Sequence, residues 1–456
     1  KKYLNDNSGN LVGKFIDIGS PHSGAPSAFR TLTYGDNLGI SYLFNFFNLN
    51  KEKIKDISQN MPSVYQLLPS QRYFDEAESN YYVFNGSNGN NRLTYSQTSD
   101  YMKVEGRNGA LVDRAKEFHE EIDDLNPGDY GVETYNIVGC GTPTIGQFYI
   151  LDDDAEHPIY NIKMINGDGT VPLRSAEAMV AETTYYVRNA THALMPSTSG
   201  VKELVASLLT ATSSPDISSY SNLALSSSGC TIPNGKIVSF HSPIELHIYD
   251  QSNNHAGPNS DGDIENNISG VAYEEIGDNK FAFLPDGVEY QVKGNATSAG
   301  TFDVRIQEMV GGEVTTTTLF ADLPLTPTTQ AQFDLGSTLP SQVYLDANND
   351  GAFELNYVVS TTTSGILEST GKVAVAAPQS EVRSSSGDSK PALDEEVPTT
   401  TPEVVSAQDI ETSMLQILPI METPVVIEVV PQPQETRYEN SAIVYKSFGY
   451  KGTDFF

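Results

Sequence analysis

Residues 1–213 alternate between short apolar runs and helical patterns. Three runs rich in β-branched and aromatic residues are typical of buried strands: residues 14–18, 135–138 and 183–187. Apolar residues also recur at helical spacing over 110–125 and 201–209. Strands that alternate with helices predict an α/β domain with a mostly parallel sheet.

Residues 235–360 have a different pattern. Short candidate strands follow one another, with turn signals such as Asp286-Gly287 and no helical stretch between them. This spacing predicts an all-β sandwich of immunoglobulin-like type, joined to the first domain by a linker over 214–234. Residues 361–456 are rich in Ser, Thr, Pro and Glu and are predicted to form a disordered acidic tail.

Composition narrows the classes of function. The chain has 456 residues, with 59 Asp and Glu against 27 Lys and Arg, so its net charge is −32. No nucleic-acid partner is expected for so acidic a chain. No apolar run reaches the ~18 residues of a spanning helix, so no transmembrane segment is expected. Two cysteines exclude a disulfide framework and a cysteine-based zinc site, but one Cys140–Cys230 bridge stays open.

A glycine-flanked aspartate is the first candidate for chemistry. Asp168 lies between Gly167 and Gly169, and glycines tolerate the loop dihedrals that would present a carboxylate at a sheet edge. His192 follows the strand predicted over 183–187. An acid and then a histidine, each on a loop, is the order of the α/β-hydrolase triad, in which the acid orients the imidazole. The alternatives are a tight acidic turn for Asp168 and an ordinary loop or helix-capping role for His192.

The chain contains no Gly-x-Ser-x-Gly nucleophile elbow. The nearest segment runs from Gly19 to Gly24, but its spacing differs and Pro21 would disrupt the strand-to-helix turn. Ser20 and Ser23 are therefore poor nucleophile candidates. We expect this segment to be a tight loop at the end of the first strand, lining the floor of a pocket.

Several segments together resemble lipases of the lecithin:cholesterol acyltransferase type: Ile18-Gly19-Ser20-Pro21-His22-Ser23-Gly24-Ala25-Pro26, Tyr34-Gly35-Asp36-Asn37, residues 61–70, Gly167-Asp168-Gly169-Thr170-Val171-Pro172 and His192-Ala193-Leu194-Met195. The resemblance covers residues 1–213. It implies a partial α/β-hydrolase fold that lacks its N-terminal strands, with a cap over 34–130. It also implies that Asp168 is the catalytic acid and His192 the general base.

In that family the nucleophilic serine precedes the segment where this chain starts. The chain begins Lys1-Lys2-Tyr3, without Met or a signal-peptide pattern, and we expect it to come from a longer protein. It would then hold the acid and the base but not the nucleophile, and would be inactive alone. An aromatic-rich stretch over 42–49 is either a lipid-facing lid or acyl pocket, or cap packing against the sheet.

The implied function is hydrolysis or acyl transfer on a lipid or ester substrate through an acyl-enzyme, at a membrane or cell surface. No cofactor is required, and the sequence does not separate water from an alcohol as acceptor. The alternative is a non-catalytic surface protein that binds carbohydrate or lipid on a degenerate hydrolase scaffold. The sandwich, the tail and the acidity indicate an extracellular or cell-surface location.

A calcium site is the one metal candidate. Asp346, Asn348 and Asp350 copy the first half of a calcium loop, but its twelfth position is Tyr357, and Glu354 would have to substitute in a shorter loop. The alternative is a β-hairpin turn, because Asp-Gly is itself a turn signal. The histidines offer no pair at a metal-ligand spacing.

Overall fold

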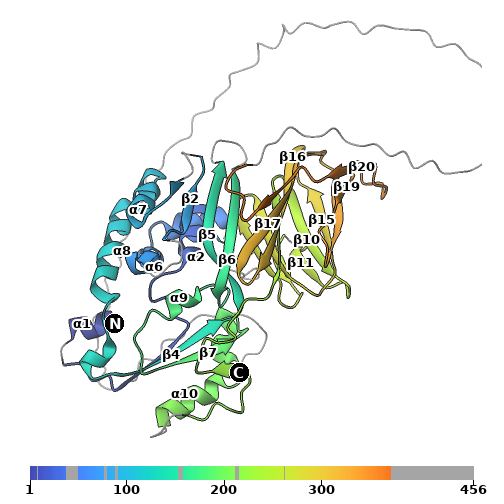
Figure 1. Ribbon diagram of the computed structural model, residues 1–456. Helices are drawn as coiled ribbons and strands as arrows, with labels where there is room; N and C mark the ends of the chain where they lie inside the picture. The colour runs from blue at the N-terminus through green and yellow to red at the C-terminus, as the bar shows by residue number, and fades with distance from the viewer. Residues whose placement is uncertain are drawn as a thin grey trace, which may run out of the picture. The chain divides into compact units, whose positions relative to one another are not determined.

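A computed structural model describes residues 1–7, 9–36, 50–75, 80–87, 91–152, 158–210, 215–260 and 262–370 (Figure 1). The aromatic-rich stretch over 42–49 lies outside the described residues, as does the predicted tail from residue 371 onward.

A parallel sheet forms from the three strands predicted in the first region. Its order is β1-β4-β7-β8, and β1, β4 and β7 run parallel to one another while β8 is antiparallel. Helix α10 buries Val201, Leu204 and Leu208 in a core shared with Ile137 and Val187 of this sheet. The strands and the helix are β1 (Lys14–Ile18), β4 (Glu133–Cys140), β7 (Thr183–Arg188), β8 (Leu223–Ala224) and α10 (Val201–Thr210). Because the carboxyl ends of parallel strands meet at one edge, loops after β1, β4 and β7 come together there.

A second sheet in this region consists of strands that the sequence patterns did not predict. Its order is β3-β2-β5-β6, and the long strands β5 and β6 form an antiparallel hairpin (Figure 1). The strands are β2 (Val83–Asn85), β3 (Asn91–Arg92), β5 (Thr142–Asp152) and β6 (Ile159–Gly167). The hairpin matters for function because its last residue, Gly167, directly precedes Asp168.

Helices account for most of the remaining first region. Helix α8 confirms the helical pattern predicted over 110–125, and it begins at an Asn108 side chain that accepts a hydrogen bond from Leu111 N–H. The helices are α1 (Lys2–Asp6), α2 (Pro26–Tyr34), α4 (Lys51–Ser58), α5 (Pro62–Tyr65), α6 (Gln71–Asp75), α7 (Tyr95–Val104), α8 (Gly109–Ile122), α9 (Leu173–Ala176), η1 (Pro127–Tyr130) and η2 (His192–Ser197).

The region after residue 234 contains two antiparallel sheets that share one hydrophobic core. Val238 and Phe240 of one sheet pack in it with Leu246 and Val292 of the other. Their orders are β12-β11-β10-β15-β18-β19-β20 and β13-β14-β9-β16-β17-β21. The strands are β9 (Gly235–His241), β10 (Ile244–Asp250), β11 (His255–Pro258), β12 (Ile264–Asn266), β13 (Ala272–Ile276), β14 (Asn279–Pro285), β15 (Tyr290–Ala296), β16 (Gly300–Val310), β17 (Glu313–Leu325), β18 (Gln330–Leu335), β19 (Gln342–Asp346), β20 (Leu355–Val358) and β21 (Thr361–Ser364).

The prediction that the tail begins at residue 361 was wrong. Residues Thr361–Ser364 form β21, which pairs with β17, and Leu367 is buried against Leu319 and Ala321. A threonine-rich composition predicts low complexity, but threonine is also a favourable strand residue. The predicted linker likewise contributes a strand, β8, to the parallel sheet.

The first region and the β region share a continuous core. Phe29 of α2 and Ile145 of β5 belong to the same buried cluster as Ile237, Ile276 and Phe281 of the β region. Strand β13, which contains Ile276, therefore packs against the first region.

Candidate active site

Asp168 is held in a fixed orientation at the end of the β5–β6 hairpin. Its side chain is buried, with 1% exposed. One carboxylate oxygen, Oδ1, accepts hydrogen bonds from the backbone N–H groups of Thr170 (3.0 Å) and Val171 (2.7 Å). The other oxygen, Oδ2, is thereby left for a side-chain partner.

The glycines around Asp168 serve two different purposes. Gly169 has φ +90°, as the loop interpretation predicts. Gly167 is needed for space instead, since a Cβ there would lie 2.4 Å from Thr144 Oγ1 and from the Val171 carbonyl oxygen. Sequence reasoning missed Gly139 of β4, where a Cβ would lie 2.6 Å from Asp168 Cβ. This close approach sets the position of the aspartate relative to the parallel sheet.

His192 begins η2, four residues after β7 ends. Its Nδ1 lies 2.8 Å from Oδ2 of Asp168, and its backbone N–H donates to the Asp168 carbonyl at 2.8 Å. The hydrogen bond to Asp168 raises the pKa of His192 against the opposing effect of burial. Among the described residues nothing is hydrogen-bonded to Nε2, and the side chain is 38% exposed. The two predicted site residues are therefore together, and no described residue occupies the distal imidazole nitrogen.

A cavity of about 560 Å³ adjoins His192. Much of its wall is apolar: Pro21, Ala25, Val64, Leu67, Ile145 and Val171. The loop between Gly19 and Gly24 lines the cavity through Pro21, in agreement with the sequence prediction. An apolar cavity beside a histidine could hold the acyl part of an ester substrate.

A second aspartate–histidine pair lies at the end of β1. His22 Nε2 is 2.8 Å from Asp17 Oδ2, and both side chains are buried. Burial alone would raise the pKa of Asp17, but hydrogen bonds from His22 and Ser20 outweigh it and lower the pKa. Ser20 Oγ donates to Asp17 Oδ1 at 2.5 Å, and Ser23 is buried. Neither serine is hydrogen-bonded to His192.

A disulfide joins Cys140 to Cys230. Cys140 ends β4, directly after Gly139, and Cys230 precedes the first strand of the β region. Asn166 reinforces the link, because its side chain accepts a hydrogen bond from Gly141 N–H and donates to the Cys230 carbonyl. The bridge that the sequence left open therefore ties the β region to the strand end beside Asp168.

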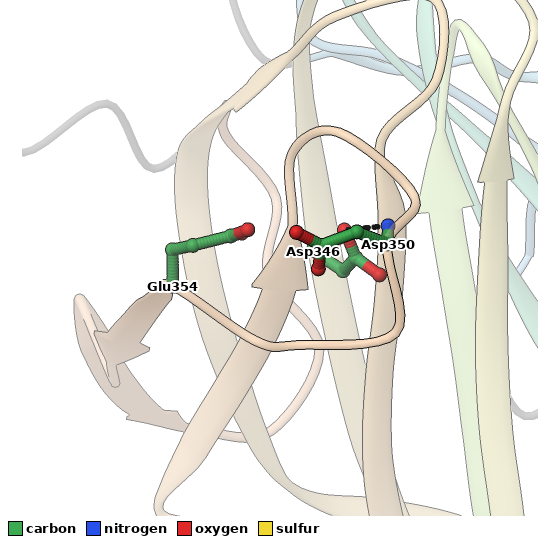
Figure 2. Close-up of side chains that lie close together, drawn as sticks. All are labelled: Asp346, Asp350 and Glu354. Atoms are coloured by element: carbon green, nitrogen blue, oxygen red, sulfur yellow. Dashed lines mark hydrogen bonds between the residues drawn. The ribbon is translucent and has the colours of Figure 1, made fainter. Parts of the chain in front are cut away.

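The predicted calcium loop groups three carboxylates. Oxygens of Asp346, Asp350 and Glu354 lie within 4.8 Å of one another in the connection from β19 to β20 (Figure 2). Asn348 instead turns its amide nitrogen toward Glu354 Oε1, at 3.0 Å. Asp346 also accepts four backbone N–H bonds, including Gly351 at 2.8 Å, which lower the pKa of its carboxyl against the effect of burial. The loop can thus be understood as a hairpin turn, with an oxygen cluster that suits a hard cation.

The remaining histidines of the β region lie apart from this chemistry. His241 is buried on β9 beside Asn279 and Ser239, while His247 lies on β10 of the other sheet. His247 Nδ1 and His255 Nε2 are 3.0 Å apart, a pairing that sequence spacing did not reveal because β11 was not predicted. Three or more His, Cys, Asp or Glu side chains come together at metal-binding separation only in the Asp346 loop, as far as the described residues go.

Comparison with known proteins supports the resemblance read from the sequence. Residues 4–126, 123 of the 456 positions, match the model of the lecithin:cholesterol acyltransferase family. No curated protein matches the chain. The family match indicates a lipid acyltransferase or lipase type of function. It ends before Asp168 and His192, whose roles must be argued from geometry. Over the described residues, none of the helices has the length and apolarity to cross a membrane.

Proposed function

We propose that this chain carries the acid and the histidine of a serine-dependent lipid ester hydrolase or O-acyltransferase with an α/β-hydrolase fold, followed by an immunoglobulin-like sandwich. The observation that carries the proposal is the Asp168–His192 pair, whose histidine lines a largely apolar cavity and has no described partner at Nε2. The nucleophilic serine would come from a segment that precedes these residues, in the order of the fold.

The chemistry follows from the two nitrogens of His192. Nε2 accepts the serine proton as the serine oxygen attacks the ester carbonyl carbon, and Asp168 stabilises the imidazolium through Nδ1. The tetrahedral intermediate then collapses, its ester C–O bond breaks, and Nε2 returns the proton to the leaving alcohol. Water or a second alcohol attacks the acyl-enzyme with Nε2 again as base, the bond from the acyl carbon to the serine oxygen breaks, and Nε2 returns the proton to the serine. Water gives hydrolysis, and an alcohol gives acyl transfer.

Labelling with a fluorophosphonate serine probe tests this proposal on the full-length protein. We expect one labelled serine upstream of Lys1, with labelling reduced at least ~10²-fold by His192→Ala. Absence of labelling and of ester turnover in the folded protein would favour the non-catalytic binding alternative. Ester turnover by residues 1–456 alone, abolished by His192→Ala, would contradict an upstream nucleophile.

We propose an extracellular or cell-surface location for the enzyme. Disulfides persist in oxidising compartments, and the Cys140–Cys230 bridge supports this assignment. Thiol titration of the denatured protein, isolated under alkylating conditions, should find neither cysteine free. A reduced pair in the native source would contradict the location.

A low-affinity calcium site in the Asp346 loop is a second proposal. Three grouped carboxylates support it. Calcium takes six to eight oxygens, so water would supply the remainder and the affinity would be weak. No step of the ester chemistry involves this loop.

A further inference from the structure

The cavity beside His192 has a charged wall that the ester chemistry does not use. Arg30 of α2, Asp36 and Glu274 of β13 all line it. Arg30 Nη2 pairs with Asp36 Oδ2 at 2.6 Å, and its Nη1 pairs with Glu274 Oε2. These two carboxylates raise the pKa of Arg30, although burial by itself would lower it. Residues from both regions of the chain therefore share one cavity with His192.

The charge on this wall argues against an anionic ligand. Two carboxylates face one guanidinium, and both terminal nitrogens of Arg30 are already engaged. A phosphate would meet a neutralised arginine and a net negative charge. Charge mismatch of this kind is a common means of rejecting wrong ligands.

A quaternary ammonium group fits poorly as well. Such cations are recognised by the faces of Trp, Tyr and Phe, and none of these three residue types is among the described residues that line the cavity. Hydroxyl groups match the wall better, because they donate to carboxylate oxygens. Glu274 Oε1 has no hydrogen-bond partner among the described residues and is available as such an acceptor.

We infer that Arg30, Asp36 and Glu274 form a selectivity wall that binds the uncharged, hydroxyl-bearing part of the ester substrate or acceptor alcohol, of the glycerol or sugar type. The apolar wall takes the acyl chain, and the hydroxyl groups lie against Glu274. The inference rests on the proposed function for its catalytic meaning. It makes the β region part of substrate selection rather than only a means of surface attachment.

The neighbouring residue provides a matched control. Glu275 also forms an ion pair with the first region, through Lys51 of α4, but it does not line the cavity. Glu274→Gln and Glu275→Gln each remove one carboxylate of β13 that is paired across the same contact. Only the former changes the cavity wall.

Calorimetric titration of residues 1–456 tests the inference without requiring turnover. The probes are glycerol monobutyrate, its phosphorylated analogue butyryl glycerol phosphate, and butyrylcholine. We expect the neutral ester to bind about tenfold more tightly than the phosphorylated ester, a difference of the size expected for charge mismatch. We expect a similar margin over butyrylcholine, because its ammonium group offers no hydroxyl to Glu274. Glu274→Gln should remove most of this preference, whereas Glu275→Gln and Glu274→Asp should retain it. Melting temperatures of the variants identify any that fail to fold.

The outcomes separate this inference from the proposed function. Preferential binding of the neutral ester, with no turnover by the full-length protein, contradicts the enzyme proposal and leaves the selectivity wall standing. Turnover by the full-length protein, with equal binding of the three esters or a preference for a charged one, overturns the inference alone. Absence of heat with every ester also overturns it, as would equal effects of Glu274→Gln and Glu275→Gln.

Discussion

The first region contains two aspartate–histidine pairs. In each, an imidazole nitrogen lies 2.8 Å from a carboxylate oxygen. In the first, Asp168 engages Nδ1 of His192, a residue that lines a cavity and whose Nε2 has no hydrogen-bond partner among the described residues. In the second, Asp17 engages Nε2 of His22, whose side chain is only 10% exposed. The two pairs differ in which imidazole nitrogen faces the aspartate, and in whether the histidine lines the cavity.

A short Asp–His hydrogen bond is therefore insufficient evidence of catalysis in this fold. Each oxygen of the Asp17 carboxylate has a hydrogen-bond partner, Ser20 on one and His22 on the other, so the pair stabilises the local structure. Asp168 is satisfied by backbone on one oxygen and directs the other at His192. Of the two histidines, His192 lines the cavity and His22 does not, so the Asp168 pair is the one placed to act on a substrate or a nucleophile.

Alanine substitution of the two histidines should separate them most strongly. His192→Ala in the full-length protein should lower kcat about 10⁴-fold or more, because it removes the general base of the proposed mechanism, with a small change in stability. His22→Ala should preserve most activity but destabilise the fold by about 2–4 kcal/mol, because it leaves Asp17 buried without its histidine. Ester kinetics and urea denaturation measure the two effects. The opposite pattern would make Asp17–His22 the functional pair.

Neutralising the aspartates should sharpen the comparison through pH. Asp168→Asn should lower kcat about 10³–10⁴-fold. Asp168 raises the pKa of His192, so its loss lowers that pKa and moves the acidic limb of the rate profile to lower pH. An unmoved limb would show that another group sets it.

Asp17→Asn should leave the acidic limb in place and act on stability instead. The folded-state pKa of Asp17 is lowered, so its stabilising contribution is present above the unfolded pKa and is lost as pH falls through the folded value. The stability difference between the Asp17→Asn variant and the native protein should therefore be largest near pH 7 and shrink below about pH 4. Denaturation at the two pH values measures it, and a constant difference would exclude this linkage.

Substitution of Gly139, the residue against which Asp168 packs, should have a smaller effect on activity. Gly139→Ala places a Cβ 2.6 Å from Asp168 Cβ and 2.5 Å from Met195 Cε, so the aspartate must move. We expect a loss of stability of about 1–3 kcal/mol and a loss of kcat of about 10²-fold. Gly13→Ala is the matched control, since nothing lies within 4 Å of a Cβ there. Equal activity of the two variants would show that Asp168 tolerates displacement.

Sequence reasoning reached the elements with strong local patterns. The strands β1, β4 and β7, the helices α8 and α10, and the pairing of Asp168 with His192 follow from apolar periodicity and motif order. The β5–β6 hairpin was missed because short apolar runs do not distinguish a strand from a buried helix.

Other features depend on contacts distant in sequence. Gly139 matters only because Asp168 approaches it, and the cavity wall needs Arg30 and Glu274 to meet across 244 residues. Strand β13 reads Ala272-Tyr273-Glu274-Glu275-Ile276, with two adjacent charges that weaken its strand pattern. Both glutamates are paired to the first region, which is why this segment can be a strand.

The Asp346 loop extends the comparison to a third aspartate and gives the smallest expected effect. Both oxygens of Asp346 accept backbone N–H groups, so its carboxylate shapes the turn, and a cation would have to share oxygens already in use. With a millimolar dissociation constant, 10 mM calcium should raise the melting temperature by roughly 1–3 °C. The double variant Asp350→Asn/Glu354→Gln should lose this shift, and Asp168→Asn should keep it. Magnesium should give less, because it demands a tighter octahedral shell. Absence of any calcium shift in the native protein would leave the loop as a turn, since four backbone bonds to Asp346 account for its conformation without an ion.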